Sequence, residues 1–442
     1  MKRPNIKPTI IVALSIVLAV AFLLERRLAG ANHTAPMTSV GTPAIDVDSQ
    51  DQPIRRAQGL IKRNPSSPDG YNQLASAYLQ MARASGDFSL NTKAEAAIGK
   101  AQELDPENFD AYSLRALVLL NYHRFSEALG AALKAQALRP ATAYVYGAIV
   151  DARVELGDYD QAVQAAQTMV DSRPDTASYS RIAHIRSLYG DTQGAIEAMS
   201  DAVKSAGAAE NAAWCRVHLG VDLINVGKLA EGERQFDLAL QDLPGFYQAL
   251  AAKARSREMA GDYDRAIQLY KESKERVPQP DTVMALGDLY QSLGRVDDAR
   301  KEYGFLATIE RAAPDPQIYS RQMALFWADH DQRLDDALNT ARQERAARSD
   351  IYSCDLLAWC LFKKNMFGEA KQAVDEALKL GTHDARICYH AGIIYQALGQ
   401  RAAAIRYLKD ALKYRVSFDN SISSFGPLQE RKTMEALQQC ER

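Results

Sequence analysis

Histidine is the side chain best suited to acid–base or metal chemistry near neutral pH, and the chain contains seven of them. No two histidines lie three or four residues apart, the spacing that places two metal ligands on one helix face. The sequence also has no match to the phosphate-binding loop, the nucleophile elbow, the dinucleotide-binding glycine motif or the HExxH zinc motif. We therefore predict no catalytic residues, no cofactor and no metal site.

Cysteine thiols could form disulfides if the protein is exported. The chain has five of them: Cys215, Cys354, Cys360, Cys388 and Cys440. None belongs to a C-x-x-C pair, and two of them fall at bulky framework positions of the repeat described below. We expect the five to behave as small buried hydrophobic side chains, and the sequence leaves their pairing open.

Composition narrows the class of protein further. The chain has 442 residues, of which 47% are apolar and 24% charged, and its formal net charge is −2. The apolar fraction supports packed cores and excludes a mainly disordered chain. Because the charge is close to zero, no global basic field favours nucleic acid, and we expect no nucleic-acid partner.

A repeat of about 34 residues organises most of the chain. Small residues recur in two series. The first series is Ala75, Ala116, Val150, Ala183, Gly220, Ala254, Gly287, Ala324, Ala358 and Gly392. The second is Ala94, Ala128, Ala162, Ala195, Gly232, Ala266, Ala299, Ala337, Ala370 and Ala404, with successive members 33 to 38 residues apart. Small side chains at fixed spacing indicate two helices that approach closely in every unit.

Turn signals occur in phase with the small residues. Five residues before the second-series alanine stand Gly157, Gly190, Gly227, Gly261, Gly294 and Gly399, with Asn365 in another unit. Glycine and asparagine accept the left-handed conformation that ends a helix. Twelve residues after that alanine stand Pro106, Pro140, Pro174, Pro244 and Pro278, where the second helix must stop.

The pattern resembles the tetratricopeptide repeat, a helix-turn-helix unit of 34 residues. The best single match runs through Leu286, Gly287, Tyr290, Gly294 and Ala299. The resemblance implies an all-α fold, an α-solenoid in which about ten units form a right-handed superhelix.

The repeat and the apolar run near the N-terminus together divide the chain into four predicted segments. Residues 1–31 are expected to be a signal-anchor or transmembrane segment and residues 32–52 a flexible linker. Residues 53–416 form the solenoid, and residues 417–442 a C-terminal loop and capping helix. A longer spacing in the first unit predicts an inserted loop around residues 84–91.

The resemblance also implies a ligand groove, because the first helix of each tetratricopeptide unit lines a concave surface through its second, fifth and ninth positions. Nine residues at such positions are candidates for ligand binding: Arg321, Tyr352, Asp355, Trp359, Arg386, Tyr389, Asp288, Arg255 and His184. Arginine together with aromatic residues is typical of protein-binding hot spots. The alternative is that Tyr352 and Trp359 pack against the next repeat.

The N-terminus carries a membrane-directed signal. Residues 10–24 contain one polar residue, Ser15, and three basic residues precede this run. The distribution of charge predicts a single-pass membrane protein with a cytoplasmic N-terminus and the bulk of the chain in the periplasm or outside the cell. The alternative is secretion after cleavage near Ala31.

Together these features predict a non-catalytic, membrane-tethered scaffold or adaptor that binds protein or peptide ligands in the concave groove on the exported side. One alternative is an assembly or accessory factor for an envelope or secretory enzyme complex. The substrate-recognition arm of a transferase is less favoured, because few residues remain after the last repeat for a catalytic domain. The chain could also form a homo-oligomer.

Overall fold

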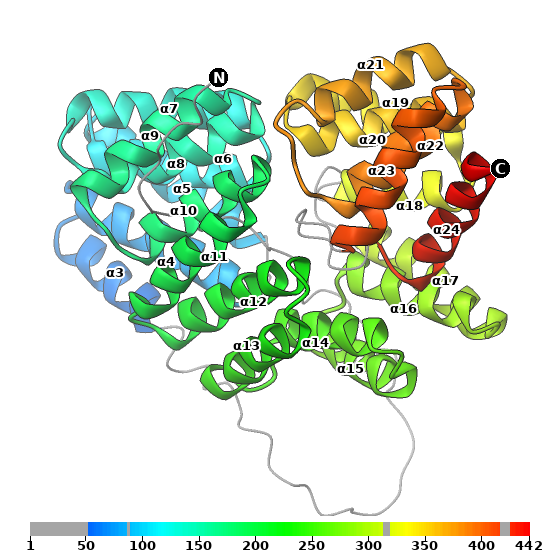
Figure 1. Ribbon diagram of the computed structural model, residues 1–442. Helices are drawn as coiled ribbons and strands as arrows, with labels where there is room; N and C mark the ends of the chain where they lie inside the picture. The colour runs from blue at the N-terminus through cyan, green and yellow to red at the C-terminus, as the bar shows by residue number, and fades with distance from the viewer. Residues whose placement is uncertain (1–51, 86–88, 313–318, 416–424) are drawn as a thin grey trace, which may run out of the picture.

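The computed structural model describes residues 52–85, 89–312, 319–415 and 425–442, and all the long elements of these residues are α-helices (Figure 1). The first half contains α3 (Gln52–Arg63), α4 (Pro68–Ser85), α5 (Ser89–Leu104), α6 (Phe109–Asn121), α7 (Phe125–Leu138), α8 (Ala143–Glu155), α9 (Tyr159–Ser172), α10 (Thr176–Leu188), α11 (Thr192–Lys204), α12 (Ala209–Asn225) and α13 (Leu229–Asp242). The second half contains α14 (Tyr247–Met259), α15 (Tyr263–Arg276), α16 (Pro280–Ser292), α17 (Val296–Ala312), α18 (Ser320–Asp329), α19 (Leu334–Ala347), α20 (Ile351–Lys363), α21 (Phe367–Ala377), α22 (Ala385–Ala397), α23 (Arg401–Tyr414) and α24 (Pro427–Glu441).

These helices form consecutive pairs, from α4–α5 to α22–α23, and each pair packs on the next. The ten pairs correspond to the ten predicted units, with α3 before them and α24 after them. The predicted all-α solenoid is therefore confirmed, and α24 lies in the segment for which a capping helix is predicted.

Close packing within each pair depends on the two series of small residues, all of which are buried. A Cβ atom on Gly392 would lie 2.6 Å from Cγ of Leu408, and one on Gly232 would lie 2.6 Å from Cγ1 of Ile224. Real Cβ atoms do not approach other atoms so closely. The small residues thus set the distance between the two helices of a unit.

The turns inside the pairs adopt the conformation that their residues predict. The six turn glycines have φ between 68° and 83°, and Asn365 has φ of 60°. In the α6–α7 turn this position is held by His123, whose φ is 56°. Sequence reasoning missed that turn, because histidine is an uncommon choice for the left-handed region.

The first unit differs from its prediction. Helix α4 continues to Ser85 and α5 already begins at Ser89, so most of the extra residues lengthen the helices. Helix therefore replaces the expected loop at residues 84–85 and 89–91, and residues 86–88 lie outside the described residues. Alanines near the end of α4, Ala82 and Ala84, favour helix over loop there.

The predicted membrane segment and almost all of the linker lie outside the described residues. Among the helices of the described part of the chain, none is both long enough and apolar enough to cross a membrane.

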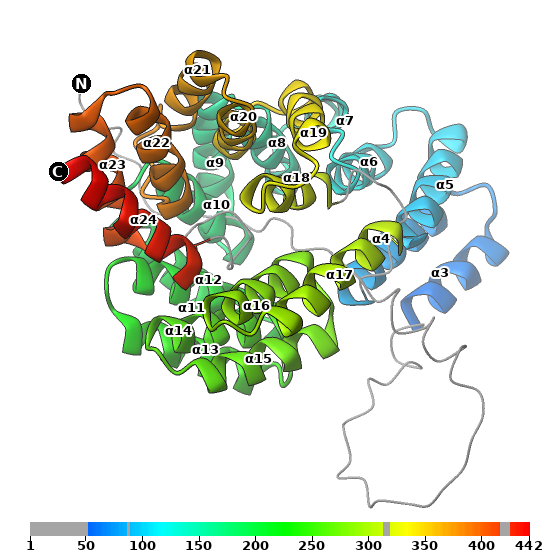
Figure 2. The same ribbon diagram turned by 90° about the vertical axis from the view of Figure 1, so that its right-hand side faces the viewer.

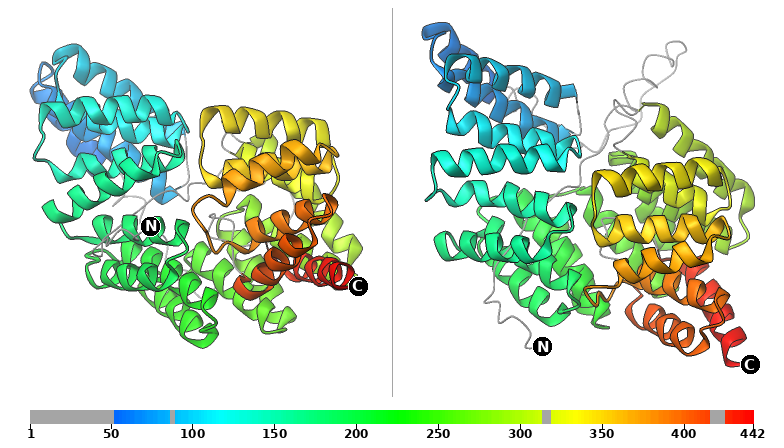
Figure 3. Two further views of the ribbon diagram at one scale, coloured as in Figure 1. Left: turned by 45° about the horizontal axis from the view of Figure 1, so that its top comes forward. Right: turned by 90° about the horizontal axis from the view of Figure 1, so that it is seen from above.

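The solenoid curves so strongly that its two halves meet. In Figure 1, α3–α11 and α18–α23 form two groups, joined below by α12–α15. Figure 3 shows the yellow and orange helices beside the teal and green ones. Helix α24 packs on α23, as a cap does, and also on α16 and α22 (Figures 1 and 2). Residues far apart in sequence therefore come together at two places, described next.

Candidate ligand-binding surface

The nine candidate residues lie on the first helices of their pairs, where the repeat places them. His184 is on α10, Arg255 on α14, Asp288 on α16, Arg321 on α18, Tyr352, Asp355 and Trp359 on α20, and Arg386 and Tyr389 on α22. Seven of the nine are buried, whereas His184 and Arg321 are half-buried. Contacts within the chain account for this burial.

Trp359 is the centre of an aromatic cluster between α20 and α22. Its ring stacks on His390 with the centroids 4.1 Å apart, and its Nε1 donates to Asp329 Oδ1 at 2.8 Å. It also lies beside Tyr389, at 5.7 Å between centroids. Trp359 is 2% exposed. The ring thus packs against the next repeat, the arrangement given above as the alternative to ligand binding.

Asp355 joins the same two helices through charge. Arg386 Nε donates to Asp355 Oδ2 at 3.3 Å, and His390 Nδ1 lies 2.9 Å from Oδ1. All three side chains are at least 97% buried. A buried carboxylate needs such partners, because leaving it unpaired would cost several kcal/mol.

A third cluster forms around Asp288 on α16. Tyr303 donates its hydroxyl to Oδ1 at 2.7 Å, and His330 Nε2 lies 3.1 Å from the same oxygen. Gln429, on the C-terminal helix α24, donates Nε2 to Oδ2 at 3.0 Å. Burial alone would raise the pKa of Asp288, but the hydrogen bonds and charge supplied by His330, Gln429 and Tyr303 hold this pKa below its usual value.

The C-terminal segment also lies against α14. Arg255 pairs with Glu258 at 3.1 Å, and its Nη2 donates to the main-chain carbonyls of Phe425 and, at 3.3 Å, of Arg415. The ring of Phe425 is 2% exposed and meets Tyr389 edge-on, with 6.2 Å between centroids. Arg255, Asp288 and Tyr389, three of the candidates, are therefore in contact with the protein's own C-terminal segment.

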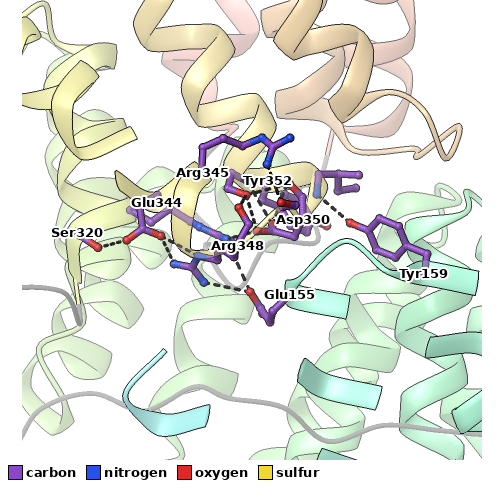
Figure 4. Close-up of polar contacts among 12 residues, drawn as sticks. Glu155, Tyr159, Ser320, Glu344, Arg345, Arg348, Asp350 and Tyr352 are labelled. Carbon is purple, nitrogen blue, oxygen red and sulfur yellow. Dashed lines mark hydrogen bonds and ion pairs between the residues drawn. The ribbon is translucent and has the colours of Figure 1, made fainter. Parts of the chain in front are cut away.

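Arg321 belongs to a different set of contacts, which we call the junction. We define the junction as the α8–α9 corner (Glu155 and Tyr159), residues 344–351 and Arg321. Figure 4 shows the corner beside residues 344–351. Arg348 donates to Glu344 at 2.7 Å and to Glu155 at 3.1 Å. Arg321 donates to Asp350 at 2.8 Å. Burial raises the pKa of Glu155, although Arg348 opposes the shift.

Main-chain contacts complete the junction. Ser349 N–H donates to the carbonyl oxygen of Glu155 at 2.9 Å, and Ile351 N–H donates to the hydroxyl of Tyr159 at 2.9 Å. A Cβ atom on Gly157 would collide with the carbonyl oxygen of Ser349. The α8–α9 corner and the α19–α20 turn, 192 residues apart at Tyr159 and Ile351, thus fit directly against each other.

A smaller contact lies beside the junction, where the turn before α22 meets α10–α12. His383 Nδ1 lies 3.4 Å from Thr192 Oγ1, and the carbonyl oxygen of His383 accepts from Asn225 at 3.5 Å. Sequence reasoning missed both contact regions. One feature of the sequence marks both regions. Ser349 and Thr382 stand at the position between units where five other units carry proline.

The clusters of the described residues were also compared with the geometry of a metal site. No group of three or more histidine, cysteine or acidic side chains is arranged there to hold a metal ion. All five cysteines are unpaired and buried, which confirms their expected burial. Burial raises the pKa of the Cys215 and Cys354 thiols to about 12, so these thiols are unreactive in the folded protein.

Comparison with known proteins adds three findings. Residues 148–213 and 218–279 match a family profile described as tetratricopeptide repeat, and residues 385–415 match a second profile with the same description. A similar curated protein is the BBSome complex member BBS4 of Bos taurus, which is 26% identical over 161 residues. That match spans 36% of this chain and only 30% of the relative.

Two solved structures are among those similar to this chain. A human IFIT1 dimer with m7Gppp-AAAA is 15% identical, with 74% of this chain and 76% of that chain covered and a TM-score of 0.49. Yeast Tom70 is 14% identical, with 89% and 92% covered and a TM-score of 0.36. The profile matches, which fall on helix pairs of the solenoid, show that this chain contains tetratricopeptide repeats.

Proposed function

We propose that this chain is a non-catalytic scaffold or adaptor whose first helices bind protein or peptide segments. The supporting observation is Arg255, whose guanidinium donates to the main-chain carbonyls of Phe425 and Arg415. Every polypeptide carries such carbonyls, so a buried cation that binds them suits recognition of a peptide segment. Stacked repeats present several such side chains along one surface.

In this proposal the nine candidate residues contribute unequally. His184 is half-buried and meets an incoming segment first, whereas Arg321 is bonded to Asp350 in the junction. The aromatic and charged clusters of α20 and α22 stabilise the surface and do not bind the ligand themselves. Trp359, Asp355 and Arg386 are already bonded to one another or to neighbouring repeats. Affinity then comes from a few well-packed anchors rather than from the total area buried.

The binding proposal is tested by site-specific photo-crosslinking in the full chain. A photoreactive amino acid at His184, on a first helix, should crosslink to a discrete protein partner in solubilised membranes. The matched control is the same amino acid at Arg300 on the second helix α17, whose side chain is 73% exposed. Equal crosslinking from both positions would contradict binding on the first-helix surface.

We also propose that residues 1–31 tether the solenoid to a membrane, with the N-terminus in the cytoplasm and the repeats in the periplasm or outside the cell. The support is the apolar run 10–24 with basic residues before it. A reporter that is active only after export, fused behind Arg442, should be active, and the protein should sediment with membranes. An active cytosolic reporter would reverse the orientation, and a soluble exported chain would favour cleavage near Ala31.

The role of assembly or accessory factor is a special case of this function, because such a factor is an adaptor with one enzyme complex as its partner. The crosslinking experiment separates the two, since recovery of a single enzyme complex from His184 would support the narrower role.

A further inference from the structure

The segment that follows the last repeat contacts the first helices as a bound peptide would. Phe425 places its ring against Tyr389, and its carbonyl oxygen accepts from Arg255. Helix α24 begins at Pro427, and in its first turn Gln429 donates to Asp288 at 3.0 Å. One short stretch thus touches three first helices: α14, α16 and α22.

Each contact has a distinct chemistry. The ring of Phe425 needs an apolar, aromatic-lined position. Gly426 suits a close approach, since a Cβ atom there would lie 3.3 Å from Glu258 Oε1. Gln429 uses both ends of its amide, because Oε1 accepts from the N–H of Gly426 at 3.2 Å while Nε2 bonds to Asp288. The site therefore recognises an aromatic residue followed by glycine, proline and a helix with glutamine in its first turn.

Detachment of the segment would uncover fewer buried residues than the loss of a whole repeat. Helix α24 buries five of its 15 residues, and only Leu428, Ala436 and Cys440 among them are apolar. Helices α22 and α23, which form the last repeat, bury ten of 13 and three of 14 residues. Because fewer buried residues would be exposed when the segment leaves, its detachment requires less free energy than the loss of a repeat.

We propose that this surface, formed by Arg255, Asp288 and Tyr389, is a peptide-binding site and that the C-terminal segment 425–442 occupies it as an internal competitor. The partner in trans carries the same chemistry: an aromatic–glycine–proline turn that starts a helix with glutamine in its first turn. This inference rests on the function proposed above and specifies its ligand and its regulation. The partner's apparent affinity is reduced by the fraction of time that the segment occupies the site.

The experiment uses a fluorescent peptide with the sequence of residues 425–442 and serine in place of Cys440. It is titrated into the full chain and into the full-length variant Phe425→Ala/Gln429→Ala, which loosens the internal segment without altering the first helices. We expect the variant to bind the peptide at least about tenfold more tightly than the unaltered chain, because the site is free for a larger fraction of the time.

Two controls make the result specific. Met434→Ala changes an exposed residue of α24, at 45% exposure, and should leave peptide affinity unchanged. A peptide with alanine at the positions of Phe425 and Gln429 should not bind either protein. Circular dichroism of both variants verifies that the repeats stay folded.

Two results would overturn the inference while the variant remains folded. One is the absence of peptide binding to the variant, and the other is equal affinity for the variant and the unaltered chain. If His184 still crosslinks to a protein partner in that case, the general binding function stands and only the internal competition is wrong. If His184 gives no specific crosslink but the peptide binds as expected, the site is real and its use for a protein partner is wrong.

Discussion

Trp359 connects three neighbouring repeats through its indole ring. One face of the ring stacks on His390 of α22, and the ring nitrogen donates to Asp329 of α18. Since the ring is 2% exposed, its removal would leave a cavity and break a hydrogen bond. At the scale of single residues, such contacts stabilise the surface that would meet a ligand.

Substitution of Trp359 measures this contribution. Trp359→Ala should lower the free energy of unfolding by about 3–5 kcal/mol, as large aromatic truncations in cores do. Trp359→Phe, which keeps an aromatic ring but loses the bond to Asp329, should lower it by less. Urea denaturation followed by circular dichroism measures both. A loss below about 1 kcal/mol for the alanine variant would show that the ring is available for a ligand.

Asp222 should make stability depend on pH. Burial raises its pKa to about 8, from an ordinary value of 3.8, while the Ser187 hydroxyl opposes the shift. Between these values the folded protein keeps the proton and the unfolded chain loses it, so the free energy of unfolding should fall as pH rises from about 4 to about 8. Asp222→Asn, which stays neutral, should flatten this slope in thermal melts over that range. An unchanged slope in the Asp222→Asn variant would show that another group causes the pH dependence of stability.

At the scale of elements, the distance between paired helices depends on residues such as Ala299 on α17. This side chain is 1% exposed and lies where α17 crosses α16. Gly304, five residues further along the same helix, has no atom within 4 Å of an added Cβ. One helix therefore offers both a crowded and an open position.

The two positions should respond oppositely to a larger side chain. Ala299→Leu should destabilise the protein by about 1–3 kcal/mol, because added methylene groups strain a packed crossing. Gly304→Ala should stabilise it by about 0.5–1 kcal/mol, because alanine favours helix and meets no neighbour. Denaturant melts of the two variants test the contrast. A neutral Ala299→Leu would mean that α16 and α17 can move apart.

Element type and phase could be predicted because they depend on local rules that repeat every 34 residues. The glycine turns and the small residues at the crossings follow such rules, whereas His123 takes a left-handed turn for which its residue type gives little warning. The first unit shows another limit, because the same spacing anomaly fits either a longer loop or longer helices. In the structure, residues that favour helix extend α4 to Ser85.

At the scale of the whole molecule, the junction turns an open solenoid into a nearly closed one. Its contacts join Glu155 and Tyr159 to residues 348–351. The sequence could not predict them, because the small rotation between neighbouring repeats accumulates over six units before these residues meet. Nor could it predict that α24 would reach α16, for the same reason.

Ser349→Pro should open the junction without disturbing the repeat. Proline stands at the equivalent position of five other units, and Arg348 has φ of −149° and ψ of 152°, which suits a residue before proline. The substitution removes the N–H that donates to Glu155. Ser349→Ala keeps that N–H and is the matched control. Small-angle X-ray scattering should show a larger radius of gyration for the proline variant only, and equal radii would show that the other junction contacts suffice.

The junction also has a consequence for the order in which the protein can be completed during synthesis. The α8–α9 corner leaves the ribosome before its partner Arg348, which lies 193 residues beyond Glu155. At translation rates of roughly 5–20 residues per second, the corner waits about 10–40 s for that partner. During that interval Glu155 and Tyr159 face solvent or a chaperone instead of the protein. A nascent chain of the first eight units thus presents this corner without its partner and is open to unwanted association there.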